Sequence, residues 1–291
     1  MTKTEFQELV KKGTVLLDGA TGSCLKEKGM PSNVCVEDWI CSNPELLTEL
    51  QKEYKEAGSQ IVYAPTFSAN CISLKKHGLE QEVERLNSSL VEISRRAVGS
   101  DVLVAGDLTT TGELLEPLGD MEEEELFEVY CQQIRALAEA GADLLVAETM
   151  LCVAETEVAV KAAAAVCDLP IMCTLTVSEN GRALFGGTAV EAVETLQELG
   201  AAAVGVNCSV GPEQLKTIVA DMKAVAKVPV IAKPNAGLPK TKGDGTVYYD
   251  MEPELFASSV GELITCGADL VGGCCGTSPA YIAALAKQIR G

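Results

Sequence analysis

Eight short apolar runs, each followed by an amphipathic segment, constrain the fold of this chain more than any other feature. The runs are TVLLDGA (14–20), QIVYAPTF (60–67), DVLVAGDL (101–108), DLLVAETM (143–150), PIMCTLTV (170–177), AAVGVNCS (202–209), VPVIAKPN (228–235) and ADLVGGCC (268–275). Nearly continuous apolar runs of this length are typical of strands covered on both faces, as in parallel sheets. The pattern therefore predicts eight parallel strands.

The segments between the runs have helical patterns. PELLTELQKEYKEAG (44–58) and EEEELFEVYCQQIRALAEAG (122–141) both end in Gly, the usual residue just past a helix end. A final helix is predicted to open at Ser278-Pro279, with Pro at its first position. Strands alternating with helices predict an α/β fold, a single (β/α)8 TIM barrel, in one domain over residues 1–291. A doubly wound sheet is the alternative, but no GxGxxG follows a strand here.

Composition excludes several classes of function. The formal net charge is −19, which argues against nucleic acid and anionic lipid as partners. No run of about 18 apolar residues is present, so no membrane span is expected. The N-terminal segment MTKTEFQELVKKG lacks the apolar core of a signal peptide, so a cytoplasmic location is expected. The 12 cysteines should then be reduced thiols.

Polar and reactive residues gather where the predicted strands end. In a TIM barrel the active site lies at these C-terminal ends. The residues at these positions are Asp18, Gly19, Thr66, Asp107, Glu148, Cys208, Asn235, Cys274 and Cys275. The sequence therefore predicts one site at this end of the barrel.

The adjacent cysteines Cys274 and Cys275 lie among glycines in GGCCGT (272–277), and Cys208 ends a run two strands away. Three thiolates that converge in a reduced compartment suggest Zn²⁺ with an open fourth position, the catalytic arrangement. Successive strand residues point to opposite faces, so both cysteines reach one ion only if the chain leaves the strand there. Gly272, Gly273 and Gly276 permit that departure. Simple burial of the thiols is the other interpretation, and spacing alone leaves both open.

Several motifs together resemble a known family. They are LLDGATGS (16–23), NPELLTELQKEYKEAGSQIVYAPTF (43–67), GDLTTTGELLEPLG (106–119), GVNCS (205–209), KPNAG (233–237) and GGCCGT (272–277). From about residue 14 to 290 the chain resembles the homocysteine S-methyltransferase family, and within it the homocysteine-binding domain of cobalamin-dependent methionine synthase. GGCCG with an upstream NCS is specific to this family. The family fold is the same barrel.

The resemblance implies that Cys208, Cys274 and Cys275 bind zinc and are the catalytic residues. The sulfur of L-homocysteine would fill the open position as a thiolate, which is the form that attacks, and take a methyl group to give methionine.

The same resemblance assigns Asp18, Gly19, Thr66, Glu148 and Asn235 to substrate binding. Asp18 and Glu148 would hold the substrate ammonium, and Thr66 with nearby backbone amides would meet its carboxylate. Asn235 would approach the metal when substrate is absent. Each has a simpler interpretation, because an Asp before Gly is commonly a turn residue and a Glu at a strand end can be solvated.

The methyl donor differs among family members, which use methylcobalamin, S-methylmethionine, S-adenosylmethionine or betaine. GELLEPLG (112–119) favours the methionine synthase branch and methylcobalamin. Because the sequence ends at residue 291 without a corrinoid domain, we expect a separate corrinoid protein, unless the sequence is a piece of a longer chain.

Trp39, the one tryptophan, favours a small sulfonium or quaternary ammonium donor if it lies near the site, where its ring would attract the cation. Plain packing is the other interpretation of Trp39. In another class of function, the cysteines would form a non-catalytic zinc or thiol-redox module.

Overall fold

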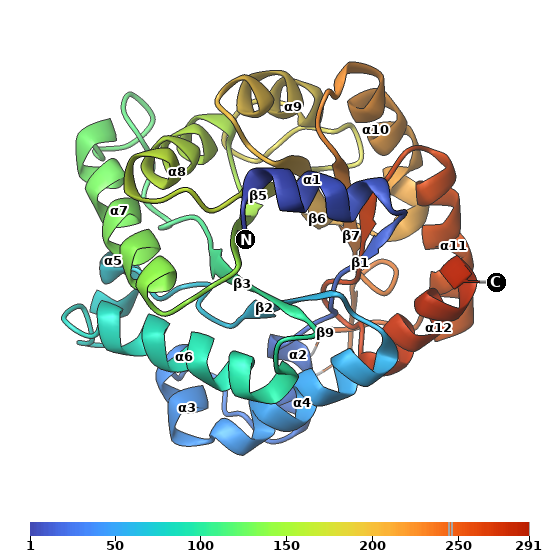
Figure 1. Ribbon diagram of the computed structural model, residues 1–291, viewed down its shortest axis with the longest axis horizontal. Helices are drawn as coiled ribbons and strands as arrows, with labels where there is room; N and C mark the ends of the chain where they lie inside the picture. Colours follow the sequence, from blue (N-terminus) through green and yellow to red (C-terminus); the bar gives the residue numbers. More distant parts are fainter. Residues whose placement is uncertain (244, 246, 291) are drawn as a thin grey trace.

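The computed structural model describes residues 1–243, 245 and 247–290. Gly291, the last residue of the predicted domain, therefore lies outside the described residues, as do Asp244 and Thr246. Within the described part, a parallel sheet curves into a barrel and a ring of helices surrounds it (Figure 1).

Eight parallel strands build the barrel. They are β1 (Val15–Leu16), β2 (Ile61–Ala64), β3 (Leu103–Leu108), β4 (Leu144–Met150), β5 (Ile171–Leu175), β6 (Ala203–Cys208), β7 (Val230–Pro234) and β10 (Leu270–Val271). Their order is β1-β10-β7-β6-β5-β4-β3-β2, and a parallel bridge between Leu17 and Ile61 joins the two edges. Each strand falls within one predicted run, so the predicted (β/α)8 barrel is confirmed.

The outer ring follows the predicted alternation. Its helices are α4 (Pro44–Ala57), α6 (Val83–Val98), α7 (Glu123–Glu139), α8 (Val153–Val166), α9 (Ala189–Glu198), α10 (Pro212–Val225), α11 (Pro253–Thr265) and α12 (Pro279–Arg290). The helices predicted from 44–58 and 122–141 are α4 and α7, and both are confirmed. Gly58 ends α4 in the left-handed conformation with a φ of 108°, and α12 begins at Pro279 as expected.

Several elements lie outside the eightfold alternation. They are α1 (Lys3–Lys11), α2 (Gly22–Glu27), α3 (Val36–Ser42), α5 (Cys71–Lys75), and a hairpin of β8 (Lys240–Thr241) and β9 (Val247–Tyr248). The helices α2 and α3 follow β1, and the hairpin follows β7, so they belong to the C-terminal end of the barrel. They lie in two long connections, residues 21–43 and 238–251.

The helix α1 lies across the opposite, N-terminal end of the barrel (Figure 1). Thr2 and Glu5 form a capping box that starts this helix. Its Phe6 is fully buried among residues at the starts of strands, including Val15 and Leu144. The N-terminal end of the barrel is therefore filled, and access to the interior is from the C-terminal end. No helix in the described part of the chain is both long and apolar enough to cross a bilayer.

Gly205 in β6 is required by the close approach of β7. A Cβ at this position would lie 2.1 Å from the carbonyl oxygen of its ladder partner, Ile231. We predict that Gly205→Ala lowers the free energy of unfolding by about 1–3 kcal/mol, the usual cost of overpacking. The check is the urea midpoint, with Gly243→Ala as control because a Cβ there meets nothing within 4 Å. Equal midpoints for the two variants would contradict the prediction.

Candidate active site at the barrel mouth

A cavity of ≈ 420 Å³ opens at the C-terminal ends of the strands. Most of the site residues predicted from the sequence line it, namely Asp18, Gly19, Glu148, Cys208, Cys274 and Cys275. Thr66 and Asn235 are buried but are not among its lining residues. The predicted concentration of polar and reactive groups at this end is therefore present, with two residues set back from the cavity.

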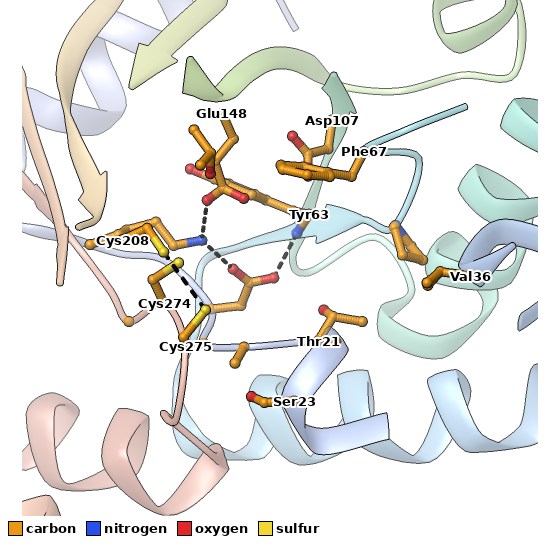
Figure 2. Close-up of a pocket in the computed structure, with 18 of the residues that line it drawn as sticks. Thr21, Ser23, Val36, Tyr63, Phe67, Asp107, Glu148, Cys208, Cys274 and Cys275 are labelled. Atoms are coloured by element: carbon orange, nitrogen blue, oxygen red, sulfur yellow. Dashed lines mark hydrogen bonds and ion pairs between the residues drawn. The ribbon is translucent and has the colours of Figure 1, made fainter. Parts of the chain in front are cut away.

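Cys208, Cys274 and Cys275 lie together on one side of the cavity (Figure 2). Cys208 ends β6, and the other two follow β10. Their three sulfur atoms lie within 4.8 Å of one another, and the sulfurs of Cys208 and Cys275 are 3.7 Å apart. All 12 cysteines are unpaired, so these thiols are available as ligands.

The backbone around the thiols explains how adjacent cysteines reach one point. The strand β10 ends at Val271, so the chain has left the sheet before Cys274, as the sequence predicted. Of the neighbouring glycines, only Gly276 adopts a positive φ, of 82°. At Gly273 the requirement is space instead, because a Cβ would lie 2.3 Å from the hydroxyl oxygen of Thr277. The backbone N–H of Cys274 donates to the carbonyl of Pro234 at 2.8 Å and ties this turn to β7.

The strand carrying Cys208 turns sharply at the same level. Cys208 and Ser209 both have a φ of 56°, in the left-handed region that non-glycine residues seldom adopt. The Ser209 hydroxyl accepts the backbone N–H of Val177 at 2.7 Å and holds this turn against the segment after β5. Strained backbone of this kind is concentrated at functional sites.

Contacts among the three thiols shift their pKa values. Hydrogen bonds from Cys208 and Cys274 lower the pKa of Cys275 to about 3. The Cys274 contact favours ionisation of Cys208, but its contact with Cys275 and its burial prevail and raise its pKa to about 12. Tetrahedral zinc with bonds of about 2.3 Å sets its sulfurs about 3.8 Å apart, so this donor set fits zinc.

A buried lysine, Lys233, lies between the two carboxylates that the sequence assigned to the substrate ammonium. Its Nζ is 3.0 Å from Oδ1 of Asp18 and 3.2 Å from Oε1 of Glu148. The contact with Asp18 is a hydrogen bond, whereas the contact with Glu148 is an ion pair without hydrogen-bond geometry. The same Nζ lies 3.7 Å from the ring centroid of Tyr63. Lys233 was not identified as a site residue from the sequence, although it is the one charged residue in the run VPVIAKPN (228–235).

Burial and like charges shape the protonation of this group. Burial opposes the charge of Lys233, but Asp18 and Glu148 outweigh it and raise its pKa well above the usual value. Burial also raises the pKa of Glu148, and the nearby charge of Asp18 adds to this. The pKa of Asp107 is raised well above its usual value by burial and then by Glu148. The cavity lining thus contains four carboxyl groups, those of Asp18, Glu37, Asp107 and Glu148, and one ammonium, that of Lys233.

Thr66 braces Asp107. Its hydroxyl accepts the backbone N–H of Asp107 at 2.9 Å and donates to the carbonyl oxygen of Asp107 at 2.6 Å. Gln133 donates to the carbonyl of Thr66 at 2.8 Å. The hydroxyl is therefore engaged with backbone, and its contact with the substrate carboxylate stays a prediction. The side chain of Asp107 lines the cavity, and its Oδ1 is buried without a hydrogen-bond partner among the described residues.

Three further residues complete the surroundings. Asn207 donates to Thr149 at 2.7 Å and to the sulfur of Cys274 at 3.7 Å, a contact that the sequence did not suggest. Asn235 is 2% exposed, and its backbone N–H donates to Val210. Trp39 in α3 packs against the hydrophobic core and does not line the cavity, which agrees with the packing interpretation.

The sequence and the fold both match known proteins. A sequence profile described as "Homocysteine S-methyltransferase" matches residues 15–289. Methionine synthase of Mycobacterium leprae is 27% identical over 311 residues, which cover 98% of this chain and 25% of that protein. This chain thus spans a quarter of the length of that relative.

Two solved structures of the homocysteine methyltransferase MmuM from Escherichia coli share the fold. The metallated form has a TM-score of 0.81 and 24% identity, covering 97% of this chain and 98% of that chain. The apo form has a TM-score of 0.76 and 26% identity, covering 96% and 97%.

Proposed function

Because this chain belongs to the homocysteine S-methyltransferase family, we propose that it transfers a methyl group to the sulfur of L-homocysteine and forms methionine. The observation that carries the proposal is the three-thiol cluster in the wall of a cavity that also holds buried carboxylates. The described residues would act as a single homocysteine-binding domain.

Cys208, Cys274 and Cys275 are the residues that would hold zinc. Bound there, the metal would make the homocysteine thiol acidic, so that the nucleophilic thiolate is available near neutral pH. The bond between the methyl group and its donor breaks as the bond to sulfur forms, and the thiol proton has already left. The protein needs no covalent intermediate of its own.

The remaining cavity residues would bind and orient the substrate and exclude water from it. The carboxylates provide acceptors for an ammonium group, and apolar lining residues such as Val36 and Phe67 exclude water from the methyl-transfer path. Gly19 allows close packing behind the cavity wall, because a Cβ there would lie 2.8 Å from the hydroxyl oxygen of Tyr54.

We propose methylcobalamin, carried by a separate corrinoid protein, as the donor. Large apolar side chains are exposed on the segments that follow β3, β5 and β7 and in the first turn of α11, all at the barrel mouth. These residues are Leu118, Leu184, Phe185, Leu238, Val247, Tyr248 and Leu255. Exposed apolar residues collected at one end of a molecule are typical of a protein-binding surface, and this is the end at which the cavity opens.

Small cationic donors have less support in the cavity. A sulfonium or quaternary ammonium group is held by aromatic faces. Trp39 does not line the cavity, and Lys233 already lies over the ring of Tyr63, which leaves Phe67 in the lining and Tyr249 beside Cys275. S-methylmethionine or betaine therefore remains the second candidate. A non-catalytic thiol module would not require the adjoining cavity and its buried carboxylates.

Methionine formation with each donor tests these assignments. We predict turnover with a methylated corrinoid protein and little with S-methylmethionine or betaine. Leu184→Asp should lower the rate with the corrinoid protein about 10-fold or more, because a charge replaces an interface apolar group. It should leave the rate with free methylcobalamin unchanged.

Lys12→Asp, an exposed change at the N-terminal end of the barrel, is the matched control. Rapid turnover with either small donor alone would overturn the corrinoid assignment. Absence of methionine with every donor would overturn homocysteine methylation itself.

A further inference from the structure

The carboxylate pair at the cavity floor already has a cation. Lys233 is 2% exposed and lies between Asp18 and Glu148. Both oxygens of Asp18 are engaged, since Oδ1 accepts from Lys233 and Oδ2 accepts the backbone N–H of Tyr63 at 2.7 Å. Asp18 is itself 1% exposed. An ammonium group arriving with a substrate would have to share oxygens of Asp18 that already have donors.

Asp107, unlike Asp18, has a carboxylate oxygen without a hydrogen-bond partner among the described residues. It is 4% exposed, its side chain lines the cavity, and its Oδ1 has no hydrogen-bond partner among the described residues. Buried polar atoms in native proteins are nearly always paired, so an exception that faces a cavity points to a ligand. Figure 2 shows Asp107 and Glu148 on the same side of the cavity. Oε1 of Glu148 has no hydrogen bond but lies 3.2 Å from Nζ of Lys233, so an ammonium group beside Asp107 would share Glu148 with Lys233.

The balance of charges in the cavity also favours a site beside Asp107 and Glu148. Asp18, Glu37, Asp107 and Glu148 are the acidic side chains among the cavity-lining residues, and Lys233 is the one basic side chain. Glu37 already accepts the backbone N–H of Ser68 at 2.9 Å. Burial and the charge of Glu148 raise the pKa of Asp107, and a positive charge close to these two carboxyl groups would favour their ionised forms. That charge would be best placed beside Asp107 and Glu148, because Lys233 already serves Asp18.

We propose that Asp107, together with Glu148, binds the ammonium group of the substrate, while Lys233 occupies the position between Asp18 and Glu148. This inference rests on the proposed function, because it concerns the amino group of the homocysteine that the site would bind. It makes Asp107 the residue by which the site distinguishes an amino-acid thiol from the same thiol without an amino group.

The test pairs a change in the protein with a change in the ligand. L-Homocysteine and 4-mercaptobutanoate differ only in the amino group, and calorimetry would measure the binding of each to the zinc-loaded protein. The unchanged protein should bind homocysteine about 10- to 100-fold more tightly, the usual range for a charge-assisted hydrogen bond. Asp107→Asn should remove this preference and leave the affinity for 4-mercaptobutanoate unchanged.

A second variant, Asp107→Ser, and zinc content measured on both variants separate a lost contact from a damaged fold. Preference retained by both zinc-loaded variants would overturn the role of Asp107, as would equal affinity of the unchanged protein for the two thiols. If the unchanged zinc-loaded protein binds neither thiol, the proposed function fails, and the inference fails with it.

Discussion

Replacement of Cys208 with Ala is expected to remove zinc from the protein and to abolish methionine formation. Cys208 supplies one of three sulfurs that lie within 4.8 Å of one another, and two thiolates do not complete a site with an open position. Even residues that only orient a metal ligand change metal affinity about 10- to 100-fold, so loss of a ligand should exceed about 100-fold. Zinc content after dialysis and the rate of methionine formation are the two measurements.

Cys167→Ala is the matched control, because it removes one thiol at the other end of the barrel. Cys167 caps the C-terminus of α8, where the chain turns back toward the start of β5. This variant should keep its zinc and its activity. Full zinc content in the Cys208→Ala protein would contradict the assignment of the three cysteines.

The second large effect is expected at Lys233. Lys233→Met retains much of the side-chain volume but leaves Asp18 buried without its cation. Breaking a buried ion pair from one side costs about 3–5 kcal/mol, because the remaining charge is not compensated. We therefore expect a marked fall in the free energy of unfolding, measured by urea denaturation at neutral pH.

Two comparisons identify the cause. Lys227→Met breaks an exposed pair with Glu198, and such pairs contribute about 0–1 kcal/mol. Adding Asp18→Asn to Lys233→Met should recover part of the lost stability, because the uncompensated charge is then gone. An unchanged urea midpoint for Lys233→Met would show that the buried triad contributes nothing to folding.

The barrel could be predicted from the sequence because its strands are covered on both faces. Burial on both sides gives nearly continuous apolar runs, and the helices between them carry their own start and stop signals, such as Pro279 and Gly58. The strand bounds were less accurate. β1 and β10 contain two residues each, because the chain leaves the sheet at Asp18 and at Gly272 to build the site.

The thiol cluster could also be anticipated, because residues that follow parallel strands meet at one end of a barrel. The position of Lys233 could not be predicted, because a strand buried on both faces gives no sequence signal for which face points into the barrel. The structure places Ile231 inside the barrel, and Lys233, two residues on, shares its face. An alternating strand would have revealed this from the sequence, whereas a strand that is apolar on both faces does not.

The role of Asp107 was hidden for a related reason. Sequence analysis placed it at the correct end of β3 but gave it no function. Its free oxygen becomes apparent only when the hydroxyl of Thr66 is seen to serve the backbone of Asp107 and Lys233 is seen to serve Asp18. The assignment of Asp107 depends on which hydrogen-bond partners its neighbours already have, and these partners cannot be read from the sequence.

The helix α1 at the far end of the barrel has a consequence for the order of events. Because Phe6 and its neighbours fill that end, homocysteine and the methyl donor would share one route to the thiol cluster. Homocysteine would have to enter first, since a bulky donor seated on the mouth closes the way behind it. Methionine would leave only after the spent donor has departed. If the proposed donor is correct, we therefore expect an ordered kinetic scheme, which would follow from a short helix that contacts neither substrate.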